Sequence, residues 1–552
     1  MLGNTSRNIH LTAMSSPLRA QCRNLMGTAT RQLSIRADSQ QIKSVAILGG
    51  GITGLSAAWY LSKLAPAVPV TLYEKSSRLG GWLNSKRVEY NGGSVLFEQG
   101  PRTLRPWSIA GLVTLDMIRQ LKLEDELAII PKTSPAARNR FIYYPDRLNE
   151  LPNSAVSAML SPRLPVMKGV LGGILKEPFR RRRSPDLQDE SVGSFISRRF
   201  GPSLAQNMVS AVLHGIYAGD IDRLSVKSLF PTMWRNEAAH GSLILGMLRT
   251  KNKAEIVDDV TLQAELTPDN AELMKKLENA SVYSFKGGIE TLSRALVTEL
   301  KKNPNITIET SADLGSVEYS PDDANLPFSL GGGKHSHVVS TLYASVTNSL
   351  LSPTHRIPAL AQIEAVTVLV VNLYFATSNL LPVEGFGYLL PKSIPSSSNP
   401  HKALGVIFDS CATPQPSETG TKVTIMLGGH YWQGRTSFPS DAEGVRMARD
   451  VLRQHLHIDE EPLAANVALN RDCIPQYNVG HDARMKDVKQ ALLETFGGRL
   501  CVAGASYRGV GMNDCIRSAR DVVKGLVEHG GRYTGLEGGG DEIRWVGNEK
   551  GR

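Results

Sequence analysis

The chain has 552 residues, of which 41% are hydrophobic, and its formal net charge is +10 at pH 7. One hydrophobic core rarely organises this length, so we expect two or three subdomains with room for an enclosed pocket. Residues 1–40 hold five arginines and one acid, so the remainder carries +6 by subtraction, a mild excess that does not indicate a nucleic-acid partner. Five scattered cysteines without a CxxC pair indicate neither a disulfide framework nor a metal site.

The first 40 residues are typical of a mitochondrial transit peptide. They are rich in Ser, Thr and Asn, contain no acid before Asp38, and lack the continuous apolar core of a secretory signal. The alternative is a disordered basic tail. The longest apolar run, residues 365–376, is too short to cross a bilayer, so we expect no spanning segment.

A glycine turn between a strand and a helix is the most informative local pattern. The apolar run 44–48 leads into Gly49, Gly50, Gly51, Ile52, Thr53 and Gly54 and then into a helix. Such a turn places a pyrophosphate at a helix N-terminus, and Glu74, after a second strand at 70–73, is positioned for a ribose diol. The alternative is a glycine-rich turn in an ordinary α/β protein.

The segment after Glu74 favours FAD over NAD. Arg78, Gly80, Gly81 and Trp82 stand where a simple NAD domain enters its next helix. Small residues there allow backbone contact along a longer cofactor, and Arg78 adds positive charge.

Further elements follow in chain order. We expect strand-like residues at 89–100 that close on the turn 100–106, an outer helix within 108–128, and a mostly helical inserted domain at 140–265. The run Arg180–Arg183 in that domain fits either anionic lipid headgroups or a solvated loop. Later strands are expected at 306–309, near Val317, at 337–341, within 365–376 and 404–430, and at 500–505.

The C-terminal strand and glycine-rich turn complete the nucleotide domain. Residues 509–514 precede a helix from Cys515, and their backbone N–H groups suit a flavin ring. We therefore expect both ends of the chain to build one domain.

Seven motifs together resemble the mitochondrial protoporphyrinogen oxidase family. They cover nearly the whole chain after residue 40, and the first two are shared with amine oxidases and carotenoid desaturases. The motifs are GGGITGL at 49–55, RLGGW at 78–82, GPRTLRP at 100–106, NRF at 139–141, GFGYL at 385–389, CIPQY at 473–477 and AGASYRGVGMNDC at 503–515.

The resemblance implies an α/β fold with a Rossmann-like FAD-binding domain, a mixed-sheet substrate domain and an inserted helical membrane-binding domain. It implies oxygen-dependent oxidation of protoporphyrinogen IX to protoporphyrin IX through FAD, with hydrogen peroxide as by-product, on the intermembrane-space side of the inner mitochondrial membrane. It adds ferrochelatase and a second copy of the chain as partners. The implied division is 1–40 transit peptide, 44–135, 280–342 and 480–530 FAD-binding, 136–265 helical, 343–478 substrate-binding and 531–552 flexible tail.

The resemblance also assigns site residues. For substrate it implies Arg140 on a propionate, with Phe386, Gly387, Leu389 and Met426 as walls around the macrocycle. For FAD it implies Gly49, Gly50, Gly51, Ile52, Thr53, Gly54, Glu74, Trp82, Gly100, Pro101, Arg102, Thr103, Val317, Ala505, Val510, Gly511 and Met512.

The residues themselves fit this chemistry without an acid–base pair. A flat, apolar dianion needs broad apolar walls and a guanidinium that binds carboxylate through two parallel hydrogen bonds, as Arg140 can. Orientation of the reacting C–H bond toward the flavin is expected to matter more than any side-chain base. The alternatives are a flavin amine oxidase and a non-catalytic, membrane-associated flavoprotein scaffold.

Overall fold

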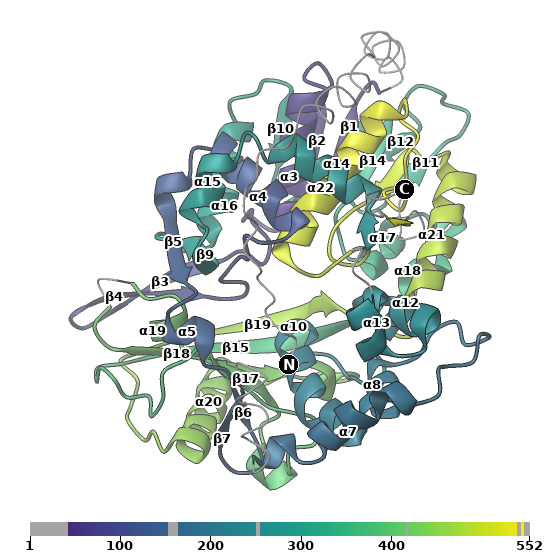
Figure 1. The fold of residues 1–552 in the computed structure, drawn as a ribbon. Coiled ribbons are helices and arrows are strands. Elements are labelled where there is room, and N and C mark those ends of the chain that lie inside the picture. The colour runs from purple at the N-terminus through teal and green to yellow at the C-terminus, as the bar shows by residue number, and fades with distance from the viewer. Residues whose placement is uncertain (1–41, 153–163, 250–253, 416–417, 538–542, 546–552) are drawn as a thin grey trace.

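The structure is a computed structural model that describes residues 42–152, 164–249, 254–415, 418–537 and 543–545. The predicted transit segment 1–40 therefore lies outside the described residues. Two larger sheets organise the molecule. In Figure 1 the purple and yellow segments from the two ends of the chain lie together at the top, and the green strands of the second sheet lie below them.

The upper sheet contains the glycine turn and is entirely parallel. Its order is β10 (Ile306–Glu309), β2 (Val70–Tyr73), β1 (Val45–Leu48), β14 (His337–Ser340) and β20 (Leu500–Val502). Central strands of parallel sheets are buried on both faces, and all four residues of β1 and of β14 are buried here. The sheet thus joins strands from both ends of the chain, as predicted.

Helices from distant parts of the chain cover this sheet. Helix α3 (Ile52–Leu64) packs against α22 (Met512–Glu528) and α16 (Glu290–Leu300), and α4 (Ile109–Gln120) packs against α22. Apolar side chains of these helices and of β1 and β2 share one core. This core fixes the first turns of α3 and α22 beside the ends of the parallel strands.

The lower sheet is mixed and has seven strands. Its order is β19 (Ala464–Pro475), β15 (Ala365–Phe375), β18 (Thr421–Gly428), β17 (Ala403–Ile407), β16 (Gly387–Leu389), β6 (Phe141–Tyr143) and β7 (Leu148–Glu150). One face of β15, with Leu369 and Val371, packs on helix α20 (Asp441–Leu456). From the other face Asn372 donates a hydrogen bond to the carbonyl of Glu98, so that face looks toward the upper part of the molecule.

The structure corrects the bounds of the predicted helical domain, 136–265. Strands β6 and β7 lie within that range but belong to the lower sheet, because strands of three residues are too short for alternation to reveal. At the other end, α14 (Val257–Leu266) packs on α4, one of the helices that cover the upper sheet. The described helices between them are α7 (Val170–Lys176), α8 (Val192–Phe200), α9 (Pro202–Leu204), α10 (Ser210–Tyr217), α11 (Val226–Leu229), α12 (Pro231–His240) and α13 (Leu243–Arg249).

Smaller elements connect these parts. Within the described ranges, no helix combines the length and apolar composition needed to cross a bilayer. The remaining strands are β3 (Ser85–Tyr90), β4 (Gly93–Glu98), β5 (Leu127–Pro131), β8 (Ala254–Ile256), β9 (Ala280–Phe285), β11 (Glu318–Tyr319), β12 (Phe328–Leu330), β13 (Gly333–His335) and β21 (Ile543–Trp545). The remaining α-helices are α5 (Pro135–Arg138), α15 (Ala271–Lys276), α17 (Ala344–Leu350), α18 (Pro358–Ala361), α19 (Asp409–Ala412) and α21 (His481–Phe496).

Candidate functional site

The glycine turn after β1 has the backbone that a pyrophosphate cradle needs. Gly49 adopts a φ of +101°, and a Cβ on Gly54 would lie 1.9 Å from the carbonyl oxygen of Gly49. Gly51 caps α3 without any side-chain hydrogen bond to the first helical turn. The N–H groups of that turn and the positive end of the helix dipole are thus free for an anion.

Glu74 lies where the ribose prediction placed it, directly after β2. One of its carboxylate oxygens accepts from the N–H of Gly50 at 2.7 Å, and the other accepts from the N–H of Ser76 at 2.8 Å. A carboxylate keeps further lone pairs after two hydrogen bonds, so Glu74 can brace the turn and still accept from a ribose hydroxyl.

The 78–82 loop touches the first glycine turn, but Arg78 is turned inward. Its guanidinium donates to the carbonyls of Leu79 and Leu83 at 3.0 Å and also to Gly81, so it holds its own loop together. This differs from the expectation that Arg78 supplies charge to the cofactor. A Cβ on Gly81 would come within 2.9 Å of Gly51, which explains why the two turns can approach.

Trp82 links the upper part of the molecule to the lower sheet. Its indole N–H donates to the hydroxyl of Tyr343, which in turn donates to the carbonyl of Cys473 on β19. Trp82 as a whole remains 38% exposed. Tyr343 was not predicted, and only the position of Cys473 in the CIPQY motif pointed to this region.

The C-terminal turn meets the first turn of α3. Gly504 has a φ of +100°, and a Cβ there would lie 3.1 Å from the hydroxyl oxygen of Thr53. Tyr477 donates its hydroxyl to the carbonyl of Ala505 and accepts from the N–H of Gly509 at 2.7 Å, which fixes the turn that leads into Val510, Gly511 and Met512. The predicted N- and C-terminal FAD residues thus come together.

Val317 lies apart from these turns. Its side chain is 1% exposed, in a core shared with Tyr73 and Val338, and its N–H donates to the carbonyl of Leu350. Any contact of Val317 with a cofactor would therefore be made by the backbone.

The loop 100–103, which the resemblance assigns to FAD, lies against both parts of the molecule. A Cβ on Gly100 would lie 2.8 Å from the carbonyl oxygen of Trp82, so the loop does approach the RLGGW segment. The guanidinium of Arg102, however, is buried and forms an ion pair with Asp409 and a hydrogen bond with Thr424. Arg102 thus reaches into the lower sheet rather than toward a bound molecule, and Asp409 was invisible to the sequence argument because it is 307 positions away.

Strand pairing assembles the predicted substrate residues. Strand β6 runs parallel to β16 with Phe141 opposite Tyr388, so Arg140 lies next to Gly387 at the start of that pair. Across the sheet, Leu389 pairs with Gly405, Gly405 with Met426 and Met426 with Val370. This row lies on the face that looks upward and forms an apolar floor.

The predicted wall residues are accessible to different degrees. Leu389, Phe386 and Met426 are half-buried, whereas Gly387 is buried and has a φ of +132°. A Cβ on Gly387 would lie 2.1 Å from the carbonyl oxygen of Val406, so close strand packing requires glycine there. The floor is therefore apolar, flat and tightly held.

His214 is buried beside the floor, because its helix α10 packs on β16 and β17 and a Cβ on the neighbouring Gly215 would meet Leu389. Its Nδ1 lies 2.7 Å from the carbonyl oxygen of Leu390, and its Nε2 lies 2.9 Å from Nε2 of His430. Burial lowers the pKa of His214 to about 3 and that of His430 to about 4. Both rings are neutral near pH 7 and serve packing.

Comparisons with known proteins agree with this geometry. A profile of flavin-containing amine oxidoreductases matches residues 52–526. The protoporphyrinogen oxidase of Schizosaccharomyces pombe is 39% identical over 88% of this chain and 98% of its own, and the human enzyme is 36% identical with the same coverage. The crystal structure of a protein assigned as a protoporphyrinogen oxidase from an Exiguobacterium species is 23% identical, with a TM-score of 0.69 over 88% of this chain and 99% of its own, a likeness in fold.

The fold and the site define an FAD-dependent oxidoreductase of the flavin-containing amine oxidoreductase class. Two glycine turns and two free helix N-termini offer N–H donors to a pyrophosphate, and Glu74 offers an acceptor to a ribose, so the residues present fit FAD. Within that class, the chain belongs to the protoporphyrinogen oxidase family.

Proposed function

We propose that this protein oxidises protoporphyrinogen IX to protoporphyrin IX in haem biosynthesis. The observation that carries the proposal is the pairing of β6 with β16, which sets Arg140 at the rim of the apolar floor formed by Leu389, Gly405 and Met426. A flat macrocycle with acidic substituents at one edge matches a floor with a cation at its rim. The identity to named protoporphyrinogen oxidases over most of their length supports the same reaction.

The chain's own residues bind and orient. FAD, when bound, would accept the electrons removed from the substrate. The floor positions the macrocycle, Arg140 holds a propionate through a bidentate ion pair, and Trp82 with Tyr343 closes the junction between the two sheets. The reaction removes six electrons and six protons from the substrate, and three O₂ molecules accept them to give three H₂O₂.

We assign the predicted FAD contacts to two groups. The N-terminal part of the chain contributes residues 49–54, Glu74, Trp82 and Gly100 to Thr103. The part after residue 300 contributes Val317, Ala505 and Val510 to Met512. Arg102 and Val317 would act through backbone atoms, because their side chains are buried against other partners.

The test is a half-reaction followed by turnover. Purified holoenzyme is mixed anaerobically with protoporphyrinogen IX while the oxidised-flavin absorbance is followed, and O₂ is then admitted while porphyrin fluorescence and peroxide are measured. Bleaching followed by porphyrin and peroxide is expected, and Arg140→Ala is expected to raise KM. A flavin that stays oxidised with this substrate but bleaches with an amine would favour an amine oxidase instead.

We also propose that the segment 168–182 of the helical part docks on an anionic membrane surface. Leu175 is 74% exposed and Phe179 is 89% exposed, and the side chains of Arg180, Arg181 and Arg182 are exposed beside them. Exposed apolar anchors flanked by cations are the pattern of a peripheral membrane site.

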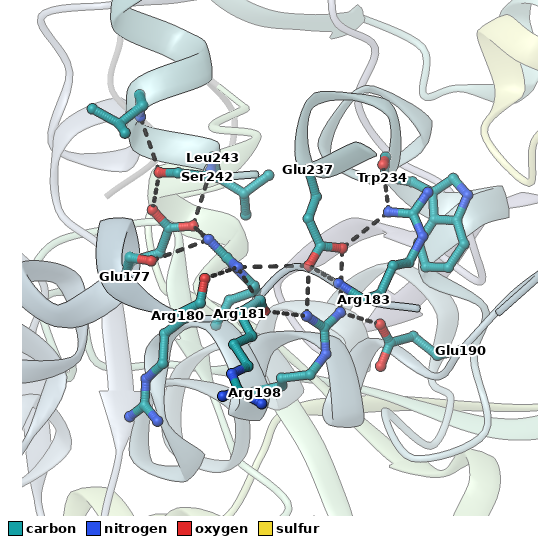
Figure 2. A network of polar contacts seen from close by, with 12 residues as sticks. Glu177, Arg180, Arg181, Arg183, Glu190, Arg198, Trp234, Glu237, Ser242 and Leu243 are labelled. Atoms are coloured by element: carbon teal, nitrogen blue, oxygen red, sulfur yellow. Dashed lines mark hydrogen bonds and ion pairs between the residues drawn. The ribbon is translucent and has the colours of Figure 1, made fainter. Parts of the chain in front are cut away.

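A network of ion pairs holds this surface in place, as Figure 2 shows. The buried carboxylate of Glu177 pairs with Arg199 and accepts from Ser242 and from the N–H of Leu243. The guanidinium of Arg199 also donates to the backbone carbonyls of Arg180 and Arg181, which leaves the side chains of those arginines free.

Co-flotation with vesicles tests the docking proposal. The wild-type protein is expected to float with vesicles in which about one fifth of the phospholipid is anionic. It is expected to remain at the bottom of the gradient with vesicles of neutral phospholipid. Leu175→Ser with Phe179→Ser is expected to abolish flotation without changing the melting temperature, and unchanged flotation would refute the assignment. The same proposal places the protein at the inner mitochondrial membrane, on the intermembrane-space side. Its proposed partners there are ferrochelatase and a second copy of the chain.

A further inference from the structure

Arg105 belongs to the GPRTLRP motif, and none of the roles above uses its side chain. The adjacent Leu104 is fixed by two backbone hydrogen bonds with Tyr283. The carbonyl of Arg105 accepts from the side-chain amide of Asn513 at 2.9 Å, in the first turn of α22. Arg105 is thus held beside the helix start that the FAD assignment places next to the flavin.

Arg105 and Arg140 share one region of the molecule. Both side chains are exposed. The pKa of Arg140 is lowered from its ordinary value, first by partial desolvation and second by the positive charge of Arg105. The geometry agrees with this. The Arg102–Asp409 ion pair ties the loop that carries Arg105 to the lower sheet, and the N–H of Phe408, next to Asp409, donates to the carbonyl of Phe386. Arg140 lies beside Gly387, the next residue, so both arginines lie at the same end of that sheet.

Neither guanidinium has a partner among the described residues, because no ion pair or side-chain hydrogen bond joins either one to them. The contrast with Arg102 is sharp, since that side chain, three positions earlier, is fully engaged by Asp409 and Thr424. Two like charges that approach each other without a counter-ion are unfavourable, and an anion bound between them removes the cost.

We propose that Arg105 is a second carboxylate-binding residue of the substrate site, so that Arg105 and Arg140 together recognise a substrate with two carboxylates on one edge. The inference rests on the proposed function and deepens it. Because the Arg105 backbone is tied to Asn513, the residue also orients that acidic edge toward the start of α22. It is a binding residue and takes no part in proton or electron transfer.

The experiment compares the diacid with its ester. Initial rates are measured for Arg105→Gln, Arg140→Gln and the double variant with protoporphyrinogen IX and with its dimethyl ester. Arg105→Gln is expected to raise KM for the diacid by about tenfold, with kcat within a factor of two, and to leave KM for the ester unchanged. Equilibrium binding of the product, protoporphyrin IX, to anaerobic holoenzyme is expected to weaken by the same factor.

Arg446→Gln is the matched control, because Arg446 lies on α20, which covers the opposite face of the lower sheet. It removes the same charge and is expected to change neither KM nor product binding.

Three results would overturn the inference. These are an unchanged KM for the diacid in Arg105→Gln, an equal rise in KM for diacid and ester, or a loss of bound FAD from that variant. Wild-type protein that oxidises neither compound would overturn the proposed function and this inference with it. Wild-type activity alongside an unaffected Arg105→Gln would remove the inference alone.

Discussion

Arg102 and Asp409 form an ion pair that joins the FAD-side loop to the lower sheet, and both side chains are at most 5% exposed. Asp409 also accepts from the hydroxyl of Thr424, which in turn accepts from Arg102 at 3.0 Å. The pair therefore ties the loop 100–103 to the lower sheet, and a change here would reach both.

Removal of one partner of this pair is expected to be costly. Arg102→Met leaves the Asp409 carboxylate buried without its counter-charge, at a cost of about 3–5 kcal/mol. The expected result is a lower melting temperature and loss of FAD during gel filtration. Arg102→Met combined with Asp409→Leu removes both charges and is expected to recover part of the stability, whereas additive losses would contradict the account.

The four arginines at 180–183 divide into two kinds. Arg183 is only 11% exposed, pairs with Glu237 at 2.9 Å and stacks over the ring of Trp234 at 3.4 Å (Figure 2). Arg183→Gln is expected to destabilise the protein by about 1–3 kcal/mol, because two charge-assisted hydrogen bonds and a cation–π contact are lost. Denaturant unfolding measures the change.

The comparison for Arg183 is Arg182→Gln, a neighbour with an exposed side chain. It is expected to leave stability within about 0.5 kcal/mol of wild type, since surface substitutions without partners have small effects. Equal losses at the two positions would show that Arg183 is not the structural member of the run.

The helix start in the glycine turn gives a third prediction. Gly54→Ala places a methyl group 1.9 Å from the carbonyl oxygen of Gly49, so either the strand or the helix must move. The variant is expected to purify without flavin, which the absorbance spectrum reports directly. Gly172→Ala is the control, because a Cβ there meets nothing within 4 Å, and alanine is expected to stabilise that helix position by about 0.5–1 kcal/mol.

Local sequence patterns predicted much of this site, but the side-chain contacts between distant residues could not be predicted from them. The glycine turns, Glu74 and the buried strands follow from steric rules within a few residues, so the sequence places them well. The partner of Arg102 lies 307 positions away, and nothing in RRRR distinguishes Arg183 from its neighbours. Sequence separation, rather than weak signal, is why the roles of these two residues had to come from the structure.

Glu98 gives a prediction for pH dependence. Burial raises the pKa of its carboxyl to about 7 from an ordinary value of 4.5, although the N–H of Ile289 and the hydroxyl of Ser85 act to lower it. The stability that the protonated acid contributes is complete below about pH 4.5 and is lost as pH rises through about 7, by about 3 kcal/mol at most. Glu98→Gln imitates the protonated form, so the melting temperature of that variant is expected to fall less than that of wild type between pH 5 and 8. Glu89→Gln, an exposed carboxyl on β3, is expected to keep the wild-type slope, and an unchanged slope in Glu98→Gln would show that Glu98 does not titrate in this range.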